Sequence, residues 1–218
     1  IDPYFLGVWL GDGSTAELAV TSADDEIVQM LYKTASQWGL VIRENYQRDN
    51  ASVTYRLSMT NASHRRGLPH KYARGRPYVY GSNPLYNAMR SYGFLVEKSH
   101  GLAGVKCIPD VYKRNSIDVR LQLLAGLIDT DGHYSNGYYE ITQKNERLAD
   151  DIIFISRSLG FAAYKTKTVK RSQFGTSGLY HRIGISGDVD KIPVRIPHKK
   201  ALPRRQKKNV LHVGVRSI

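Results

Sequence analysis

Two stretches of the sequence end in an aspartate followed by glycine, a position from which a carboxylate can do chemistry. They are FLGVWLGDG at residues 5–13, which contains Asp12, and LLAGLIDTDG at residues 123–132, which contains Asp131. Two carboxylates at the ends of paired helices repel each other and face the negative end of the helix dipole, unless a cation lies between them. Magnesium accepts carboxylate and carbonyl oxygens. The candidate metal ligands are therefore Asp12, Asp131, Gly11 and Thr130, the last two through their carbonyl groups. A metal held in this way beside a basic surface is typical of phosphodiester hydrolysis.

Small residues in the same stretches indicate how the carboxylates are brought together. Read as helices, the stretches place small residues one turn apart on a single face, as with Gly7 and Gly11 in the first and Gly126 in the second. Small residues on one face let two helix backbones approach closely. We therefore expect the two helices to pack against each other, with the two carboxylates side by side at their ends.

The composition favours a polyanionic partner. The chain has 218 residues, with 32 Lys and Arg against 19 Asp and Glu, and a formal net charge of +13. An excess of this size fits nucleic acid first and an anionic membrane second. No apolar run approaches the roughly 20 residues that a membrane helix needs. The single cysteine, Cys107, excludes an internal disulfide and a cysteine-based zinc cluster, which suits a reducing compartment.

An internal repeat organises the chain. Residues 21–39 and 142–160 follow the two aspartates, are both 19 residues long, carry apolar residues at helical spacing and end in glycine. Alternating segments come next, and they align Arg56 on Arg182. Each half then reaches a Lys-x-x-Pro sequence, at Lys106 and at Lys200.

The repeat predicts an α+β fold of two pseudo-symmetric halves, each of αββαββα type. We place the first half at residues 1–120 and the second at 121–218, together forming one domain. Residues 83–94 (NPLYNAMRSYGF) add a helical piece to the first half. Duplication implies a pseudo-two-fold axis, across which equivalent residues face each other.

LLAGLIDTDG resembles the signature motif of the LAGLIDADG homing endonucleases at every position but one, and FLGVWLGDG resembles the degenerate first copy of single-chain, two-motif members. The likeness covers nearly the whole chain and is strongest to the endonuclease domain of a yeast or fungal intein. It implies a magnesium-dependent hydrolase that cuts both strands of DNA at a long, non-palindromic target. Manganese would substitute for magnesium, and calcium would support binding without cleavage.

The resemblance also assigns roles to single residues. The last aspartate of each motif, Asp12 and Asp131, binds metal, while Asp129 is an interface or capping residue. Gln143 orders active-site water, and its counterpart in the first half is Ser22. The catalytic lysines fall on Lys106 and Lys200, with Lys199 and Lys191 as alternatives to Lys200.

In this family two antiparallel sheets form a DNA-binding saddle below two central LAGLIDADG helices. Alternate side chains of such ribbons reach base edges in the major groove. The candidate base-reading residues are Arg43, Glu44, Asn45, Gln47, Arg48, Asn50, Arg56, Ser58, Lys165, Lys167, Lys170, Arg171, Gln173, Tyr180 and Arg182. Two basic stretches, at 64–76 and 198–208, are candidate phosphate contacts, through Arg65, Arg66, Lys71, Arg74, Arg76, Lys199, Arg204 and Arg205.

The expected partner is double-stranded DNA, bound by a monomer whose natural precursor could contain a splicing domain around it. No membrane partner is expected, and the expected location is intracellular, nuclear in a eukaryote. The main alternative is a DNA- or RNA-binding protein of the same fold whose catalysis is lost or repurposed, such as a splicing maturase. The intact aspartates and lysines favour cleavage.

Overall fold

The computed structural model describes residues 1–46, 52–59, 83–95, 105–171 and 177–203, without the side chains of Lys170 and Arg171. In chain order the elements are α1 (Pro3–Asp12), β1 (Ala19–Ser22), α2 (Asp25–Gln37), β2 (Val41–Tyr46), β3 (Val53–Ser58), α3 (Pro84–Ser91), α4 (Asp110–Lys113), α5 (Ile117–Asp131), β4 (Gly132–Ser135), β5 (Tyr138–Gln143), α6 (Glu146–Ser158), β6 (Ala162–Arg171), β7 (Ser177–Ser186) and the 3-10 turns η5 (Val189–Lys191) and η6 (Pro197–Lys199).

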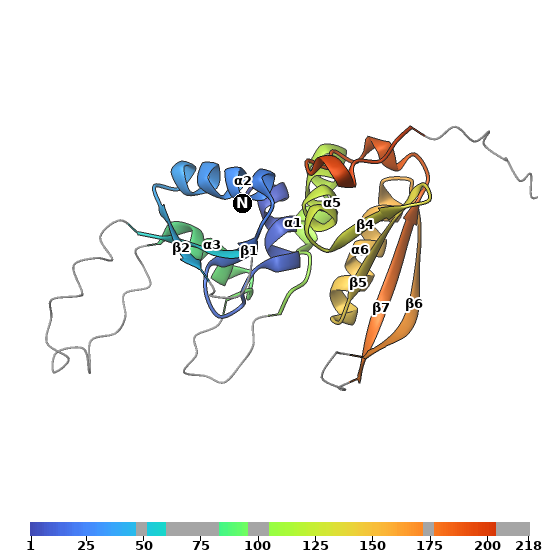
Figure 1. Cartoon of the computed structure of the whole chain (residues 1–218), viewed down its shortest axis with the longest axis horizontal. Helices are drawn as coiled ribbons and strands as arrows, with labels where there is room; N and C mark the ends of the chain where they lie inside the picture. The colour runs from blue at the N-terminus through green and yellow to red at the C-terminus, as the bar shows by residue number, and fades with distance from the viewer. Residues whose placement is uncertain (47–51, 60–82, 96–104, 172–176, 204–218) are drawn as a thin grey trace, which may run out of the picture.

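Helices α1 and α5 contain the two motifs and pack side by side at the centre of the molecule (Figure 1). The motif parts of both helices are buried on every side, at residues 4–10 and 123–129. Their backbones touch: a Cβ atom at Gly7 would lie 2.2 Å from the carbonyl oxygen of Leu123, and one at Gly126 would lie 2.3 Å from that of Tyr4. Glycine is therefore required by space at the helix crossing, as the sequence predicted.

One antiparallel sheet lies on each side of the paired helices (Figure 1). The first has the strand order β1-β3-β2 and the second β4-β5-β7-β6. Helix α2 covers one face of the first sheet and helix α6 covers one face of the second, through apolar residues such as Leu31 and Ile155. The other face of each sheet is open. The expected α+β class with two antiparallel sheets is confirmed.

The repeat is visible in the elements. Helices α2 and α6 are both 13 residues long, and each is followed by a glycine with positive φ, Gly39 at 65° and Gly160 at 87°. Residues with a Cβ are strained in this left-handed region, so glycine ends both helices. The boundary that we placed between residues 120 and 121 falls inside α5, which begins at Ile117.

The first half departs from the expected αββαββα order in its first hairpin. In the second half β4 and β5 form this hairpin, beginning with the pair Gly132–Ile141. Among the described residues of the first half, only an isolated bridge between Gly13 and Val20 stands in place of the first strand. A shorter connection explains why this strand is missing from the first half. The segment from Asp12 to Thr21 is two residues shorter than the equivalent segment from Asp131 to Thr142.

The sequence alignment of Arg56 on Arg182 is wrong by two residues. Arg56 pairs with Ala19 and Arg43, and the corresponding position in the second sheet, opposite Glu140 and Tyr164, is occupied by Gly184. A slip of two residues preserves the alternation of a strand, so both arginines still point to the open face of their sheets. No helix in the described part of the chain is long and apolar enough to span a membrane.

We predict that Gly126→Ala lowers the free energy of unfolding by about 3 kcal/mol, because the new methyl group meets backbone atoms that cannot move independently. This loss exceeds the gain of about 1 kcal/mol from the helix propensity of alanine. Urea denaturation measures it. The control is Gly184→Ala, where a Cβ has nothing within 4 Å; equal stability of the two variants would contradict the close helix contact.

Candidate active site

The two motif aspartates lie at adjacent helix ends. Asp12 is the last residue of α1 and Asp131 the last of α5. A Cβ atom at Gly11 would lie 2.0 Å from Oγ1 of Thr130 and 3.4 Å from Oδ2 of Asp131, which shows how closely the two ends meet. The structure thus brings together the four predicted metal ligands.

The electrostatics of this pair are those of two crowded carboxyl groups. Burial first and the neighbouring Asp131 second raise the pKa of Asp12 to about 6, against the opposing effect of Lys106 and Lys199. Burial also raises the pKa of Asp131, while a hydrogen bond from Gln143 and the two lysines act in the other direction. Negative charge at this position is therefore costly in the free protein, and a cation would relieve the cost.

The side chain of Lys106 reaches the C-terminal end of α1. Its Nζ donates to the carbonyl oxygen of Gly11 at 2.6 Å and lies 5.5 Å from the ring centre of Trp9. Burial lowers the pKa of Lys106, and the nearby carboxylates of Asp131 and Asp12 oppose this effect. A cation that donates to the last carbonyls of a helix is stabilised by the helix dipole.

The second lysine of the site is Lys199, and Lys200 is not beside the aspartates. Nζ of Lys199 donates to the carbonyl oxygens of Asp129 at 2.7 Å and Thr130 at 3.0 Å, so it holds the end of α5 as Lys106 holds the end of α1. Lys200 is exposed. Lys191, the other alternative, pairs with Asp188 at 3.2 Å. The Lys-x-x-Pro spacing does not fix which lysine points inward, because this segment is a 3-10 turn.

Gln143 contacts one of the two motif aspartates. It is the last residue of β5, and its Nε2 donates to Oδ2 of Asp131. Its counterpart Ser22 instead accepts from the backbone N–H of Asp24 at 3.2 Å.

Asp24 is a site residue that the sequence analysis missed. Its carboxylate acts to raise the pKa values of both Lys199 and Asp12. The repeat contained the signal, because Asp24 is two residues after Ser22 just as Asn145 is two residues after Gln143. Both residues precede a helix of the same length.

Asp129 has the interface role expected of it. Its side chain is buried and accepts hydrogen bonds from the hydroxyl of Tyr4 at 2.6 Å and from the backbone N–H groups of Arg195 at 2.8 Å and Ile196 at 3.2 Å. It therefore joins α1, α5 and the segment that leads to Lys199.

The donor set fits a hard divalent cation. Two carboxylates and the carbonyls of Gly11 and Thr130 are all oxygen ligands, which is the set that Mg²⁺ prefers. In the described part of the chain no cluster of three or more His, Cys, Asp or Glu residues could hold a metal by itself. Lys106 and Lys199 hold those same two carbonyls in the structure.

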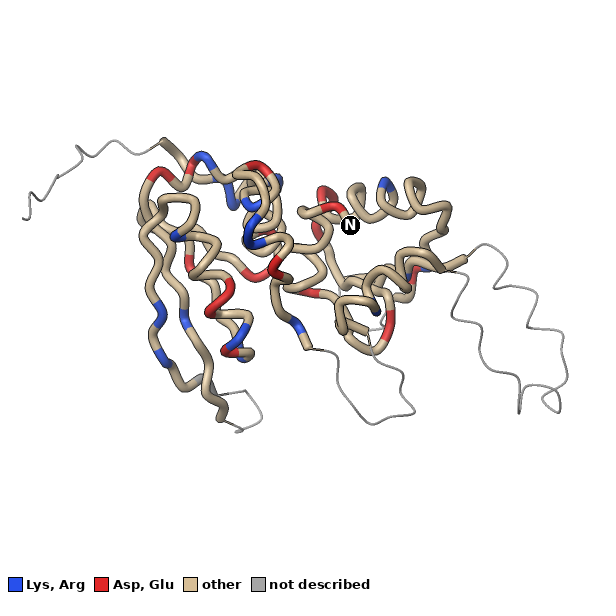
Figure 2. The backbone as a smooth tube through the Cα atoms, turned by 180° about the vertical axis from the view of Figure 1, so that it is seen from behind, with Lys and Arg blue, Asp and Glu red and all other residues tan. Residues whose placement is uncertain are grey.

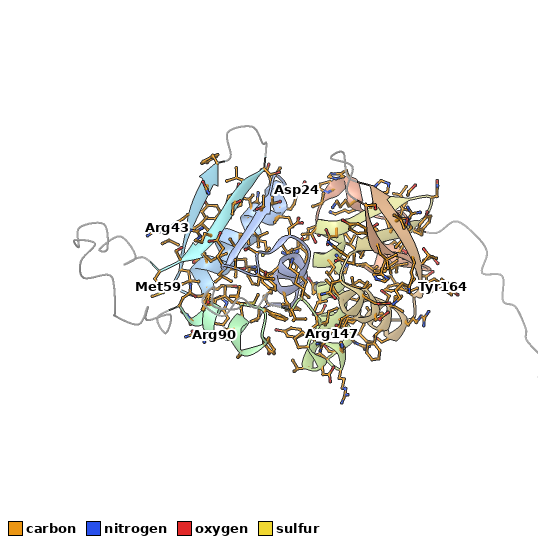
Figure 3. All side chains as sticks on the ribbon, turned by 90° about the horizontal axis from the view of Figure 1, so that it is seen from below. Asp24, Arg43, Met59, Arg90, Arg147 and Tyr164 are labelled. Atoms are coloured by element: carbon orange, nitrogen blue, oxygen red, sulfur yellow. The ribbon has the colours of Figure 1, made fainter. Side chains whose placement is uncertain are left out.

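The open face of the first sheet carries part of the predicted base-reading set. Arg43, on β2 (Figure 3), is opposite Arg56 on β3. Asn45 and Ser58 lie on the same face by register. Glu17 forms an ion pair with Arg56. Two arginines directly opposite each other destabilise a sheet, so this face favours an anionic partner.

Glu44 was wrongly placed among the base-reading residues. It alternates with Arg43 and Asn45 and so points to the side covered by α2, where it accepts a hydrogen bond from the hydroxyl of Tyr32 at 2.5 Å.

The second sheet divides its predicted residues between two faces. Arg182 is on the open face, where its Nε lies 3.2 Å from Oε1 of Glu140. Lys165 points to the helix side and pairs with Glu146 at 3.1 Å and with Asp150. Lys167 shares that side, since it is opposite the buried His181. The prediction that both lysines read bases is wrong, because it ignored the alternation of β6.

The remaining predicted residues divide into two groups. Thr142, Thr166 and Tyr180 share the open face with Arg182 by register, and the sequence analysis missed the two threonines. Lys170 and Arg171 end β6, and their side chains lie outside the described part. Predicted DNA contacts that also lie outside the described residues are Gln47, Arg48, Asn50, Arg65, Arg66, Lys71, Arg74, Arg76, Gln173, Arg204 and Arg205.

We predict that Asp12→Asn stabilises the metal-free protein above pH 7. The pKa of this carboxyl rises from 3.8 in the unfolded chain to about 6 in the fold. Between these values the folded protein binds more protons, so its free energy of unfolding falls as the pH rises. Because Asp12 is partly open to solvent, which screens its charge, we expect a gain of about 1 kcal/mol. Urea denaturation with a chelator at pH 8 measures it. The gain should vanish below pH 4, and a variant less stable than wild type at pH 8 would contradict the assignment.

Comparison with known proteins agrees with this geometry. A family model described as "Homing endonuclease" matches residues 107–195. The homothallic switching endonuclease of Saccharomyces cerevisiae is 30% identical over 179 residues, which are 78% of this chain and 29% of that protein. The replicative DNA helicase DnaB of Mycobacterium intracellulare is 29% identical over 182 residues, 83% of this chain and 23% of that protein. The chain thus spans less than a third of the length of these curated relatives.

Among solved structures, I-DmoI in complex with DNA and Ca is similar with a TM-score of 0.48 and 13% identity, covering 85% of this chain and 82% of that one. I-WcaI bound to its DNA recognition sequence gives 0.44 and 13%, covering 93% and 86%. The sequence matches confirm the resemblance that the two motifs indicated: this chain is a relative of the homing endonucleases.

Proposed function

We propose that the protein is a site-specific DNA endonuclease that hydrolyses one phosphodiester bond in each strand of its target. One observation carries the proposal: Asp12 and Asp131, each with a lysine at the same helix end, meet between two sheets with open faces. The similarity to an endonuclease over most of the chain supports it. A binding protein with lost catalysis would not need this set of charged residues in so unfavourable an arrangement.

The chemistry needs stabilisation of negative charge. A water oxygen bonds to phosphorus while one ester oxygen leaves, and charge builds on the phosphate and on the leaving oxygen. A divalent cation held by Asp12 and Asp131 would supply Lewis acidity and a polarised water. Gln143 fixes the orientation of Asp131, and Lys106 and Lys199 stabilise the developing charge, one for each strand.

DNA binding rests on the open faces of the two sheets. Figure 2 shows Lys and Arg positions along the two long strands of the second half, β6 and β7, and acidic positions near the paired helix ends. By register Arg182 of β7 is on the open face, whereas Lys165 and Lys167 of β6 face α6. The net charge of +13 predicts strong salt dependence, with log affinity falling by about 0.9 per phosphate neutralised for each tenfold rise in salt. Two unequal sheets would read two unlike halves of one long, non-palindromic site.

We also propose finer features of this function. The oxygen donor set favours magnesium, with manganese as a substitute. The internal repeat supplies both halves in one chain, so a monomer with a pseudo-two-fold axis is sufficient. Its DNA target would be intracellular, and in its precursor the chain could be embedded in a splicing domain.

The first experiment is cleavage of target DNA, found by selection from a random library, in the presence of magnesium. Wild type should cut both strands, and Asp131→Asn should abolish double-strand cleavage while DNA binding persists, because the amide keeps the shape but loses the charge. Full activity of this variant would disprove the metal assignment.

Lys199→Ala and Lys200→Ala form a matched pair for the same assay. Only Lys199 contacts the end of α5, so we expect its loss to lower the single-turnover rate by about 100-fold, the scale for one charge-stabilising group. Lys200→Ala should stay within about threefold of wild type. A purely binding protein of this fold would bind the selected DNA and cut neither strand.

Base preference should depend on the sheet face. We predict that Arg182→Ala relaxes preference at bases on one side of the cut, losing about 1–3 kcal/mol of discrimination there, and that Arg56→Ala does so on the other side. Lys165→Ala is the control, because its side chain faces α6 and not the open face. Profiling of single-base target variants measures all three, and a uniform loss with Arg182→Ala would show a phosphate contact instead.

A further inference from the structure

Asn145 makes two hydrogen bonds with different purposes. It is the N-cap of α6, where its Oδ1 accepts from the backbone N–H of Leu148 at 3.3 Å. Its Nδ2 donates to the carbonyl oxygen of Lys106 at 2.7 Å. The first bond starts a helix of the second half, and the second holds the backbone of a lysine that belongs to the first half.

A second contact from α6 holds the same segment. Asp151, buried on this helix, accepts from the backbone N–H of Ile108 at 2.7 Å and pairs with Lys113 at 2.5 Å. On the other side of the lysine, the N–H of Val105 donates to Gly93 at a longer 3.3 Å. Residues 106–108 are therefore fixed mainly by α6, and Asn145 is the contact at the lysine itself.

The internal repeat supports a role for this position. The counterpart of Asn145 in the first half is Asp24, the N-cap residue of α2. Asp24 interacts electrostatically with Lys199, a lysine of the second half. In both halves the residue before the helix thus interacts with the lysine of the other half, Asn145 by a hydrogen bond to the backbone of Lys106 and Asp24 through the charge of its side chain.

We propose that Asn145 is a positioning residue for Lys106 and thereby sets the rate at which one DNA strand is cut; this rests on the proposed endonuclease function. Asn145 holds the backbone of Lys106 through the carbonyl oxygen of that lysine. The side chain of Lys106 extends from this backbone, and its Nζ donates to the carbonyl oxygen of Gly11. When that carbonyl is released, the ammonium group loses its fixed distance from the end of α1. Misplacement by about 1 Å can cost about 100-fold in rate.

The test variant is Asn145→Asp. Aspartate caps a helix as well as asparagine does, so α6 keeps its first turn, but the carboxylate cannot donate to Lys106 and repels its carbonyl. Asn145→Ser also keeps a capping oxygen and is too short to reach, and it adds no charge. The control is Asn83→Asp: Asn83 caps α3 through Tyr86 at 2.9 Å and donates to the carbonyl of Leu57 at 3.2 Å, away from the site.

The first measurement is the single-turnover rate for each strand with end-labelled target. For Asn145→Asp and Asn145→Ser we expect one strand to be cut about 10- to 100-fold more slowly, with nicked DNA accumulating, and the other strand within about twofold of wild type. DNA affinity and melting temperature should match those of Asn83→Asp. Equal rates on both strands, or equal slowing of both strands, would overturn the proposal.

The second measurement does not need cleavage. Acetylation by an amine-selective reagent, read by mass spectrometry, compares Lys106 with Lys199 in the same molecule. We expect the ratio of Lys106 to Lys199 modification to rise about fivefold in both Asn145 variants, the effect of one lost hydrogen bond of ordinary strength, and to stay unchanged in Asn83→Asp. An unchanged ratio overturns the positioning role. Failure of wild type to cut any DNA would instead contradict the proposed function, and the acetylation ratio would still decide the role of Asn145.

Discussion

The backbone contact between α1 and α5 is the constraint on which the rest of the structure depends. Two helices can approach this closely only where both lack side chains. At Gly7 and at Gly126 the backbone of the facing helix leaves no room for a Cβ atom. The contact brings the two helix ends together, and the last residue of each helix is an aspartate. It also fixes the separation of the two sheets, because each sheet packs beside its own motif helix (Figure 1).

This packing produces an electrostatic conflict that distant parts of the chain resolve. Two negative helix ends and two carboxylates meet in one place, and burial raises the pKa values of both Asp12 and Asp131. Lys106 is 95 residues from its partner Gly11, and Lys199 is 70 residues from Asp129. Active-site geometry in this protein is thus a property of the whole fold, although the motifs themselves are short.

The sequence predicted the features that depend on local pattern and failed where register decides. The paired helices, the repeat and the aspartates follow from small residues, helical spacing and the position of glycine. The choice between Lys199 and Lys200 depends on one residue of register in an irregular turn. The misplacement of Lys165 and Glu44 has a similar cause, because side chains alternate along a strand and basic composition does not reveal the face. Asp24 and Asn145 could have been found by following the repeat two residues further.

The two halves share their active-site supports, which has a consequence for how the duplication is understood. Asn145 and Asp151 of the second half fix the segment of Lys106, while Asp129 joins α1 and α5 to the segment before Lys199. The first half therefore lacks a complete set of supports for Lys106, whereas Lys199 is held within its own half, where Tyr139 donates to its carbonyl oxygen at 2.8 Å. The asymmetry between Asp24 and Asn145 places a carboxylate near one lysine and an amide near the other. Since an amide neither attracts nor neutralises an ammonium group as a carboxylate does, an endonuclease of the proposed kind would present two differently charged environments to the two strands of DNA and would cut them at different rates.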